Sequence, residues 1–531
     1  MKNRLPVSHG LHRFNGGIRF TDLHNEFTQH AIVKMPLPQQ LVLPLKQHIG
    51  DAAVAYVKAG NTVRKGQLLA EAKNYISAPV HAPTSGIITA IEEREIPHPS
   101  GLTAPCIVMD CDGEDRRFEG EAIPDYRDMD KSHLRNLIRD AGIVGLGGAA
   151  FPSAVKLNPG LRRKVHCLIV NAAECEPYIN CDDLLIRERA DEIVQGIEIA
   201  RYCLGVKQCK IGIEDSMPEA YAALVEAIKT AATKDIEVVV VPTLYPTGGE
   251  KQLIKVLTGM EVPQDGLPAD IGIVCHNVGT LYAIARAILH NEPLVSRIVT
   301  VTGQGVKRPN NVEALFGTQI ADIIEFCGGY NEDVSRLLMG GHMMGFALHS
   351  DQLPLVKAAN CILAGTPDEL PEPNPPRPCI RCGMCEQACP ANLLPQQLYW
   401  YAKAKEFDKT HEYNLFDCIE CGCCSYVCPS EIPLVQYYRY AKTEIWNAAR
   451  EREKSDAARQ RFEFRQQRLE REAQEKAEKA RLRKEALRKK TQSSEAKQAA
   501  IQAALERVKK KKEEVQDKEK REKEKGEGET L

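Results

Sequence analysis

The pattern of apolar and polar positions divides the chain into segments of different period. Residues 31–120 hold short apolar runs such as QLLAEA and GIITAI between glycine- and proline-containing turns, which is typical of a small all-β unit. Residues 130–296 hold near-continuous apolar runs (VHCLIVNAA, QCKIGIED, IEVVVVPT, ADIGIVCHNVG) separated by helical stretches such as DEIVQGIEIARYCLG. This alternation predicts buried parallel strands covered by helices.

The segments on either side of these two regions are shorter. Residues 1–30 predict an arm with little regular structure, in which Gly16-Gly17 indicates a turn or a close backbone contact. Residues 297–350 predict a small α+β module of short strands followed by a helix. Residues 351–377, which end in PEPNPPRP, predict a linker into a helical, cysteine-rich domain at 378–445. The predicted fold class is therefore multidomain, β and α/β.

Composition adds a charge asymmetry and a cellular compartment. Of the 531 residues 43% are hydrophobic, enough for several packed cores, and the net charge is only −2. Residues 451–531 nevertheless hold 26 Lys and Arg against 19 Asp and Glu, so the predicted tail at 446–531 is basic. Its sparse large apolar residues favour a solvated charged helix that fades into disorder. With no apolar stretch of about 18 residues and no signal peptide, we expect a cytoplasmic chain with reduced thiols.

Two copies of one cysteine pattern carry the strongest chemical signal. Each copy reads C-x2-C-x2-C-x3-C-P, and the second follows the first at an offset of 39 residues. This spacing is typical of two-cluster ferredoxins, in which the fourth cysteine of each run binds the other 4Fe–4S cluster. The pattern predicts one cluster on Cys379, Cys382, Cys385 and Cys428, and a second on Cys418, Cys421, Cys424 and Cys389.

Other interpretations of these cysteines are weaker. Zinc ribbons use C-x2-C pairs with a longer spacer, and a disulfide framework does not suit a cytoplasmic chain. The repeat also extends past the ligands, because QLYWYAK after the first run recurs as QYYRYAK after the second. Cys423 is a spare thiol in the second run, for which we expect packing beside a cluster and no iron bond. The predicted function at this end of the chain is electron transfer.

A glycine-rich loop opens the predicted α/β region. It reads GIVGLGGAAFPS from Gly142 to Ser153, and Lys156 follows. Clustered glycines let backbone N–H groups approach a phosphate, and a helix start after them favours negative charge. The loop matches neither of the general ATP and NAD glycine motifs.

Four motifs in this region resemble the FMN- and NADH-binding subunit of respiratory complex I. The glycine loop is similar to that family's flavin loop, and Asn171-Ala-Ala-Glu174-Cys-Glu176-Pro resembles its N-A-D-E-x-E-P segment. Gly249-Glu250 resembles its G-E-E-T-A-L segment, and Asn277-Val-Gly-Thr280 its N-V-E-T segment, in the same order. This chain departs from the family at Ala173, Lys251 and Gly279, and Tyr245 lies one residue further from Glu250 than the family's Tyr.

Over residues 1–445 the domain order resembles the RnfC family, the C subunits of Rnf (Rsx) ion-translocating electron transport complexes. Residues 31–120 are similar to the barrel-sandwich fold of biotinyl and lipoyl carriers, without a counterpart of their modified Lys, so we expect a structural role. Residues 297–350 resemble a soluble-ligand-binding β-grasp module. The resemblance implies a flavin/NAD site at Gly145, Gly147, Gly148, Lys156, Asn171, Glu174, Glu250, Asn277 and Thr280.

The same resemblance implies a function. FMN can exchange electron pairs with NAD(H) and single electrons with iron–sulfur clusters. The chain would be a peripheral subunit on the cytoplasmic face of the bacterial inner membrane, with integral membrane and iron–sulfur partner subunits, a ferredoxin-type electron partner and no nucleic acid. No residue is expected to act as a nucleophile or general acid. Two alternatives stay open: a soluble flavin and iron–sulfur NADH dehydrogenase (diaphorase) subunit, and a flavin-free iron–sulfur scaffold.

Overall fold

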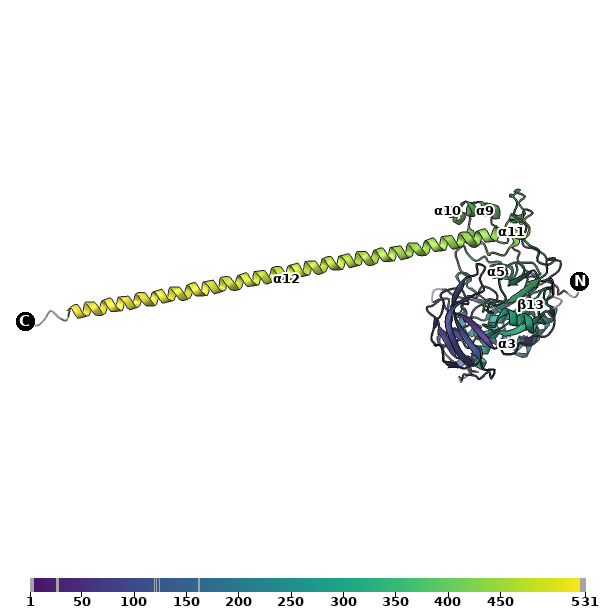
Figure 1. Cartoon of the computed structure of the whole chain (residues 1–531), viewed down its shortest axis with the longest axis horizontal. Coiled ribbons are helices and arrows are strands. Elements are labelled where there is room, and N and C mark those ends of the chain that lie inside the picture. The colour runs from purple at the N-terminus through teal and green to yellow at the C-terminus, as the bar shows by residue number, and fades with distance from the viewer. Residues whose placement is uncertain are drawn as a thin grey trace, which may run out of the picture. The chain divides into compact units, whose positions relative to one another are not determined.

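The structure is a computed structural model that describes residues 4–24, 28–118, 120, 122–123, 125–160 and 163–525 (Figure 1). It divides into two compact units, Met1–Thr443 and Glu444–Leu531, which are described separately. The last six residues of the predicted tail, 526–531, lie outside the described residues.

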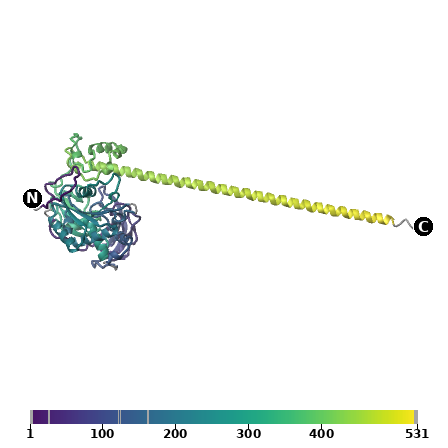
Figure 2. The same ribbon diagram turned by 180° about the vertical axis from the view of Figure 1, so that it is seen from behind.

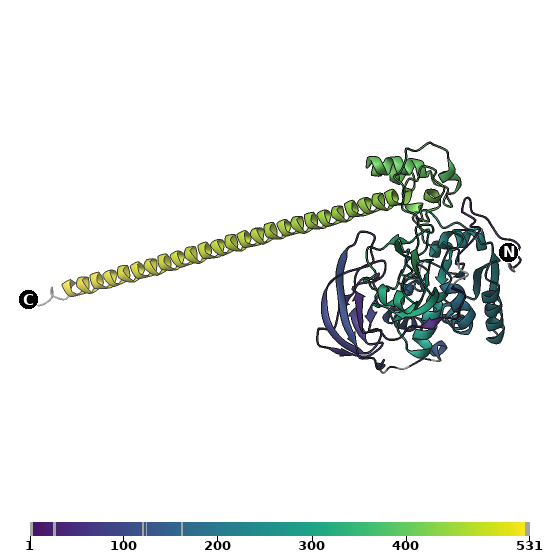
Figure 3. The same ribbon diagram turned by 45° about the vertical axis from the view of Figure 1, so that its right-hand side comes forward.

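The first domain of the larger unit is a pair of antiparallel sheets, drawn in blue and purple in Figure 3. One sheet has the order β2-β8-β7-β4 and the other β3-β5-β6. Leu41, Leu43, Ile88, Ile107 and Met109 are fully buried between them, which confirms a small all-β unit with its own core. The strands are β2 (Gln40–Pro44), β3 (Val54–Ala55), β4 (Thr62–Val63), β5 (Leu68–Glu71), β6 (Val80–His81), β7 (Gly86–Glu95) and β8 (Thr103–Cys111).

The α/β core follows. Its four strands lie in the order β11-β10-β9-β12 and all pair in parallel, as the near-continuous apolar runs predict. The strands are β9 (Cys167–Ala172), β10 (Gln208–Glu214), β11 (Ile236–Val241) and β12 (Ile273–Asn277). The helices are η2 (Tyr126–Asp128), α1 (Lys131–Asp140), α2 (Ser153–Lys156), α3 (Cys181–Leu204), α4 (Pro218–Thr230), α5 (Glu250–Thr258), η3 (Pro268–Ile271) and α6 (Val278–His290). Loops at the carboxyl ends of β9 and β12 therefore meet at one edge of the sheet.

A fourth, six-stranded sheet has the order β1-β14-β13-β17-β15-β16, and it corrects two predicted boundaries. Strand β1 comes from the predicted barrel-sandwich segment but pairs with β14, and β17 comes from the predicted linker but lies between β13 and β15. The linker prediction is wrong here because the apolar run at 361–364 is completely buried. The elements are β1 (Val33–Lys34), β13 (Ser296–Thr302), β14 (Asn310–Leu315), α7 (Ile320–Phe326), β15 (Arg336–Met339), β16 (Phe346–Ala347) and β17 (Cys361–Gly365).

The cysteine-rich domain repeats its local conformation along with its sequence. Arg381-Cys-Gly383 and Glu420-Cys-Gly422 place a left-handed residue on each side of the second cysteine in both runs, with φ of 57° and 82° in the first and 58° and 82° in the second. Each run then enters a one-turn helix. The elements are α8 (Met384–Gln387), α9 (Pro395–Ala404), α10 (Phe407–Glu412), η4 (Leu415–Asp417) and α11 (Cys423–Tyr426).

The final helix is α12 (Leu434–Lys525), drawn from green to yellow in Figures 1 and 2. Every side chain from Glu451 to Arg521 is exposed, as its charged composition predicts. No helix in the described part of the chain combines the length and apolarity needed to cross a membrane.

Candidate functional site

The glycine loop is held at its base and open at its tip. The Gly145 N–H donates to the Phe151 carbonyl oxygen at 2.8 Å, and the Leu146 N–H donates to Thr280 Oγ1 at 2.9 Å. Gly147 and Gly148 are exposed, and Gly148 has φ +117° with no atom within 4 Å of an added Cβ. Helix α2 after the loop has only four residues, so its dipole is small. The loop would therefore bind a phosphate mainly through its backbone N–H groups, and only weakly through the dipole of helix α2.

The other predicted side chains meet the loop from neighbouring elements. Lys156 of α2 forms an ion pair with Glu250, the first residue of α5, and donates to the Cys275 carbonyl oxygen at 3.2 Å. Asn171 of β9 donates to the Gly248 carbonyl oxygen at 2.8 Å. Burial lowers the pKa of Lys156, but the charges of Glu250 and Cys275 more than offset this, so the net pKa is raised. The structure thus brings separate motifs to one edge of the sheet.

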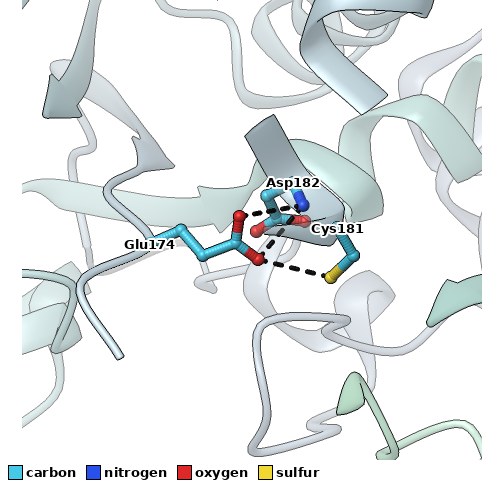
Figure 4. Close-up of side chains that lie close together, drawn as sticks. All are labelled: Glu174, Cys181 and Asp182. Carbon is cyan, nitrogen blue, oxygen red and sulfur yellow. Dashed lines mark hydrogen bonds between the residues drawn. The ribbon is translucent and has the colours of Figure 1, made fainter. Parts of the chain in front are cut away.

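Glu174 lies at the start of helix α3 (Figure 4). Its carboxylate accepts from the backbone N–H groups of Asp182 and Asp183 at 3.1 Å and from the Cys181 thiol at 3.3 Å. Burial and the Asp182 charge raise the pKa of Glu174 well above its ordinary value. Glu174, Cys181 and Asp182 are close enough to hold a metal ion, but these hydrogen bonds already account for a helix cap.

Two further residues, which the sequence analysis missed, contact the predicted site residues or the glycine loop. Asp182 accepts a hydrogen bond from Asn277 Nδ2, and burial raises the pKa of Asp182 to about 6. Arg297 is buried and donates to the carbonyl oxygens of Leu146 (3.0 Å) and Lys357. Neither residue stands in a distinctive motif. Both were recognisable only once the fold placed them behind the glycine loop.

The vicinity of the loop has unused hydrogen-bonding capacity. Four buried side-chain atoms on the elements that carry the predicted residues have no hydrogen-bond partner among the described residues: Ser153 Oγ, Thr247 Oγ1, Gln252 Oε1 and His276 Nε2. Such atoms are costly unless something satisfies them. Together with the open glycine tip, they fit a polar ligand bound at this edge.

A cavity of about 1380 Å³ lies beside this edge, between the β domain, α3, α6 and β13. Its lining includes Leu146, Asp182, Gly279 and Arg297, which are neighbours of the predicted flavin residues. None of the nine predicted residues lines it. The cavity therefore adjoins the predicted site without being formed by it.

One predicted cysteine set encloses a cavity of its own. A small cavity in the cysteine-rich domain is lined by Cys389, Cys418, Cys421 and Cys424, the four residues assigned to one cluster from the spacing. Cys423 is fully buried and does not line it. The crossed arrangement, with the fourth cysteine of one run among the first three of the other, fits a cubane cluster.

The other set lies nearer the surface. Cys379, Cys385 and Cys428 are partly buried, and Cys382 is exposed. Arg377 N–H donates to the Ser430 carbonyl oxygen at 2.9 Å, and Ser430 Oγ donates to the Pro378 carbonyl oxygen at 3.0 Å. These bonds join the segment before Cys379 to the segment after Cys428, as a shared cluster requires.

Comparison with known families assigns a domain to each region. Residues 12–114 match the RnfC barrel sandwich hybrid domain, and residues 138–286 match the Nuo51 FMN-binding domain. Residues 298–347 match the SLBB domain, and residues 378–432 match a 4Fe-4S dicluster domain. FMN and two 4Fe–4S clusters are thus the cofactors of this chain, and the open glycine loop and the cysteine-lined cavity fit them.

Relatives over most of the chain share one name, the C subunit of the ion-translocating oxidoreductase complex. The Yersinia pestis bv. Antiqua member is 47% identical over 459 residues, which cover 86% of this chain and 73% of the relative. This chain belongs to that family. The Vibrio cholerae serotype O1 (strain O395) member is 51% identical over 499 residues, 93% of this chain and 64% of the relative. The chain thus spans slightly less than two thirds of the length of such longer relatives.

Among solved structures, an NAD+-reducing [NiFe]-hydrogenase in the H2-reduced state aligns with a TM-score of 0.45 and 19% identity. The alignment covers 56% of this chain and 60% of the hydrogenase chain. A similarity at this level carries no argument about function.

Proposed function

We propose that this chain transfers electrons between NAD(H) and iron–sulfur partner proteins within an ion-translocating complex. FMN would exchange electron pairs with the nicotinamide and single electrons with the clusters. The chain's own residues would position these groups and exclude water. Partner subunits embedded in the membrane would move the ions, with this chain bound peripherally on the cytoplasmic face of the inner membrane and a ferredoxin-type protein as electron partner.

The residues proposed to hold FMN are those that meet at the carboxyl edge of the core sheet. Gly145, Gly147 and Gly148 would present backbone N–H groups to the phosphate, with Lys156 as a nearby cation. The remaining members of the proposed set are Asn171, Glu174, Glu250, Asn277 and Thr280. Two members of the set, Lys156 and Glu250, form an ion pair, and Thr280 accepts a hydrogen bond from Leu146, which lies between Gly145 and Gly147.

The contact between the core and one cysteine set carries the proposal. Tyr245, which lies in the loop before Gly248 and Glu250, donates from its hydroxyl to the Cys421 carbonyl oxygen at 2.6 Å. Cys175, between Glu174 and Glu176, packs in the same buried cluster. The cavity lined by Cys389, Cys418, Cys421 and Cys424 is thus the one next to the core. The set with the exposed Cys382 is the one proposed to face a redox partner.

Anaerobic mixing with NADH tests the proposal. We expect loss of flavin absorbance followed by reduced-cluster signals in electron paramagnetic resonance spectra. Substitution of Cys382 by Ser should leave NADH-dependent reduction of the remaining cluster, whereas Cys421→Ser should prevent transfer out of the core. Purified protein that retains FMN but whose clusters stay oxidised with NADH would contradict the proposal. Release of the chain from membranes by salt separates it from the soluble diaphorase alternative.

A further inference from the structure

The N-terminal arm, residues 4–24, is bound to the α/β core along its first half. Ser8 exchanges hydrogen bonds with Val240 of β11, since its N–H donates to the Val240 carbonyl oxygen at 3.0 Å and its Oγ accepts from the Val240 N–H at 2.9 Å. The His12 N–H donates to the Val256 carbonyl oxygen of α5 at 3.0 Å. Phe14 is 8% exposed and packs into the apolar cluster formed by β9, β11 and α5. Phe14 thus anchors this half of the arm.

Directly after this anchor the arm contacts the cysteine-rich domain. Asn15 Nδ2 donates to Asn392 Oδ1 at 2.9 Å, and the Gly17 N–H donates to the Ala388 carbonyl oxygen at 3.0 Å. A Cβ added to Gly16 would lie 2.6 Å from the Ala388 carbonyl carbon and 2.8 Å from that of Cys389. Only glycine permits this approach, so the close backbone contact predicted for Gly16-Gly17 is present.

The arm then pairs with the loop that reaches the other cysteine run. Ile18 and Tyr245 exchange backbone hydrogen bonds of 2.8 and 2.9 Å. The Phe20 ring packs edge-on against both Tyr245, at a centroid distance of 5.9 Å, and Tyr426, at 5.5 Å. Tyr245 in turn donates to Cys421, so the arm, the core and both cysteine loops share one contact region. In Figure 2 the dark purple arm passes between the teal core and the green cysteine-rich domain.

We infer that residues 14–20 position the iron–sulfur cluster of Cys389, Cys418, Cys421 and Cys424 against the flavin core. The arm donates a hydrogen bond to Ala388, next to Cys389, and reaches the Cys421 backbone through Tyr245. Cys389 and Cys421 are predicted ligands from the two different runs. The arm thereby fixes the separation across which electrons pass between the two domains. Gly16 and Tyr245 are positioning residues in this sense, and the inference rests on the proposed function.

Gly16→Ala tests the inference, and Gly10→Ala is its matched control. Both glycines lie in the arm with similar backbone angles, φ +65° and +74°, so both substitutions strain the backbone alike. An added Cβ meets backbone atoms at Gly16, whereas no atom of the described residues lies within 4 Å of one at Gly10. Tyr245→Phe is a second variant that removes only the hydroxyl bonded to the Cys421 carbonyl oxygen.

Holoprotein prepared anaerobically is compared for iron, FMN, hydrogen–deuterium exchange and stopped-flow reduction by NADH. We expect Gly16→Ala to keep FMN and the rate of flavin reduction, to increase exchange at residues 385–393, and to slow cluster reduction by up to about 100-fold, as small displacements between reacting groups can do. Tyr245→Phe should slow the same step, and Gly10→Ala should match the wild type.

Equal exchange and equal cluster reduction in Gly16→Ala and Gly10→Ala would overturn the inference. If Gly16→Ala fails to fold, unchanged transfer in Tyr245→Phe would overturn it as well. If the wild type lacks FMN or does not react with NADH, the proposed function fails. The exchange measurement then still decides whether the arm holds the cysteine loops.

Discussion

Lys357 provides a prediction whose magnitude follows from its surroundings. It lies between β16 and β17, is 2% exposed, and donates from Nζ to the carbonyl oxygens of Pro79 (3.0 Å) and Gly142 (2.8 Å). Gly142 begins the glycine loop of the α/β core, and Pro79 belongs to the β domain. The Lys357 side chain thus connects the domain of the six-stranded sheet to both of the others. Burial lowers the pKa of Lys357 from 10.5 to about 7.

This pKa makes the stability of the protein depend on pH in a definite direction. Between about pH 7 and 10.5 the unfolded chain holds a proton that the folded chain has lost, so stability rises with pH by about 1.4 kcal/mol per pH unit. Below about pH 7 both states are protonated and the full cost of roughly 5 kcal/mol applies. Lys357→Met removes this cost but leaves two buried carbonyl groups unpaired, at about 1–3 kcal/mol each. The wild type and Lys357→Met should therefore have similar free energies of unfolding at pH 7.

Anaerobic urea titrations at pH 7, 8 and 9, followed by far-ultraviolet circular dichroism, measure the effect. The free energy of unfolding of the wild type minus that of Lys357→Met should rise by about 2 kcal/mol across this range. Neighbouring His81, with a pKa of about 3, and His48, with a lowered pKa, are neutral throughout. The exposed Lys58→Met control should show no such trend. A difference that stays constant with pH would refute this account of Lys357.

Three further predictions concern the cofactors. In iron and sulfide assays, Cys421→Ser should lose about four of about eight iron atoms, whereas Cys423→Ala should keep them all. Equal iron loss in both variants would mean that Cys423 is a ligand. Deleting residues 451–531 should leave iron and FMN content unchanged, because residues 451–521 of that segment are exposed throughout, and a loss of iron would contradict this. Lys156→Met should weaken FMN binding about tenfold in fluorescence titrations, a loss of roughly 1.4 kcal/mol, while exposed Lys164→Met should not.

The features predicted well from sequence are those with a local physical signal. The spacing of the cysteines determines which thiolates can surround one cluster, and the crossed set that includes Cys389 does line a single cavity. Near-continuous apolar runs predicted the parallel strands β9 to β12 correctly, because most of their residues are buried on both faces of the sheet, the exposed first half of β11 excepted. The close backbone contact at Gly16-Gly17 is predictable because two adjacent glycines leave room for another segment of the backbone.

The features missed depend on contacts between distant segments. The prolines that follow strand β17 closely favour a linker, and only the pairing of β17 with β13 and β15 shows that it belongs to a sheet. Asp182, Arg297 and Lys357 carry no motif, and each matters through burial next to a segment far away along the chain. In the sequence Tyr245 is distinctive only for its offset from Glu250, because its partner Cys421 lies 176 residues further along the chain.

A chain that joins a flavin core to two iron–sulfur clusters must contain both kinds of cofactor in fixed amounts. The decisive measurement is anaerobic purification with iron, acid-labile sulfide, zinc and FMN quantified per chain. We expect about eight iron, about eight sulfide and about one FMN, with no bound zinc. Zinc in place of iron, or iron without sulfide, would contradict this expectation.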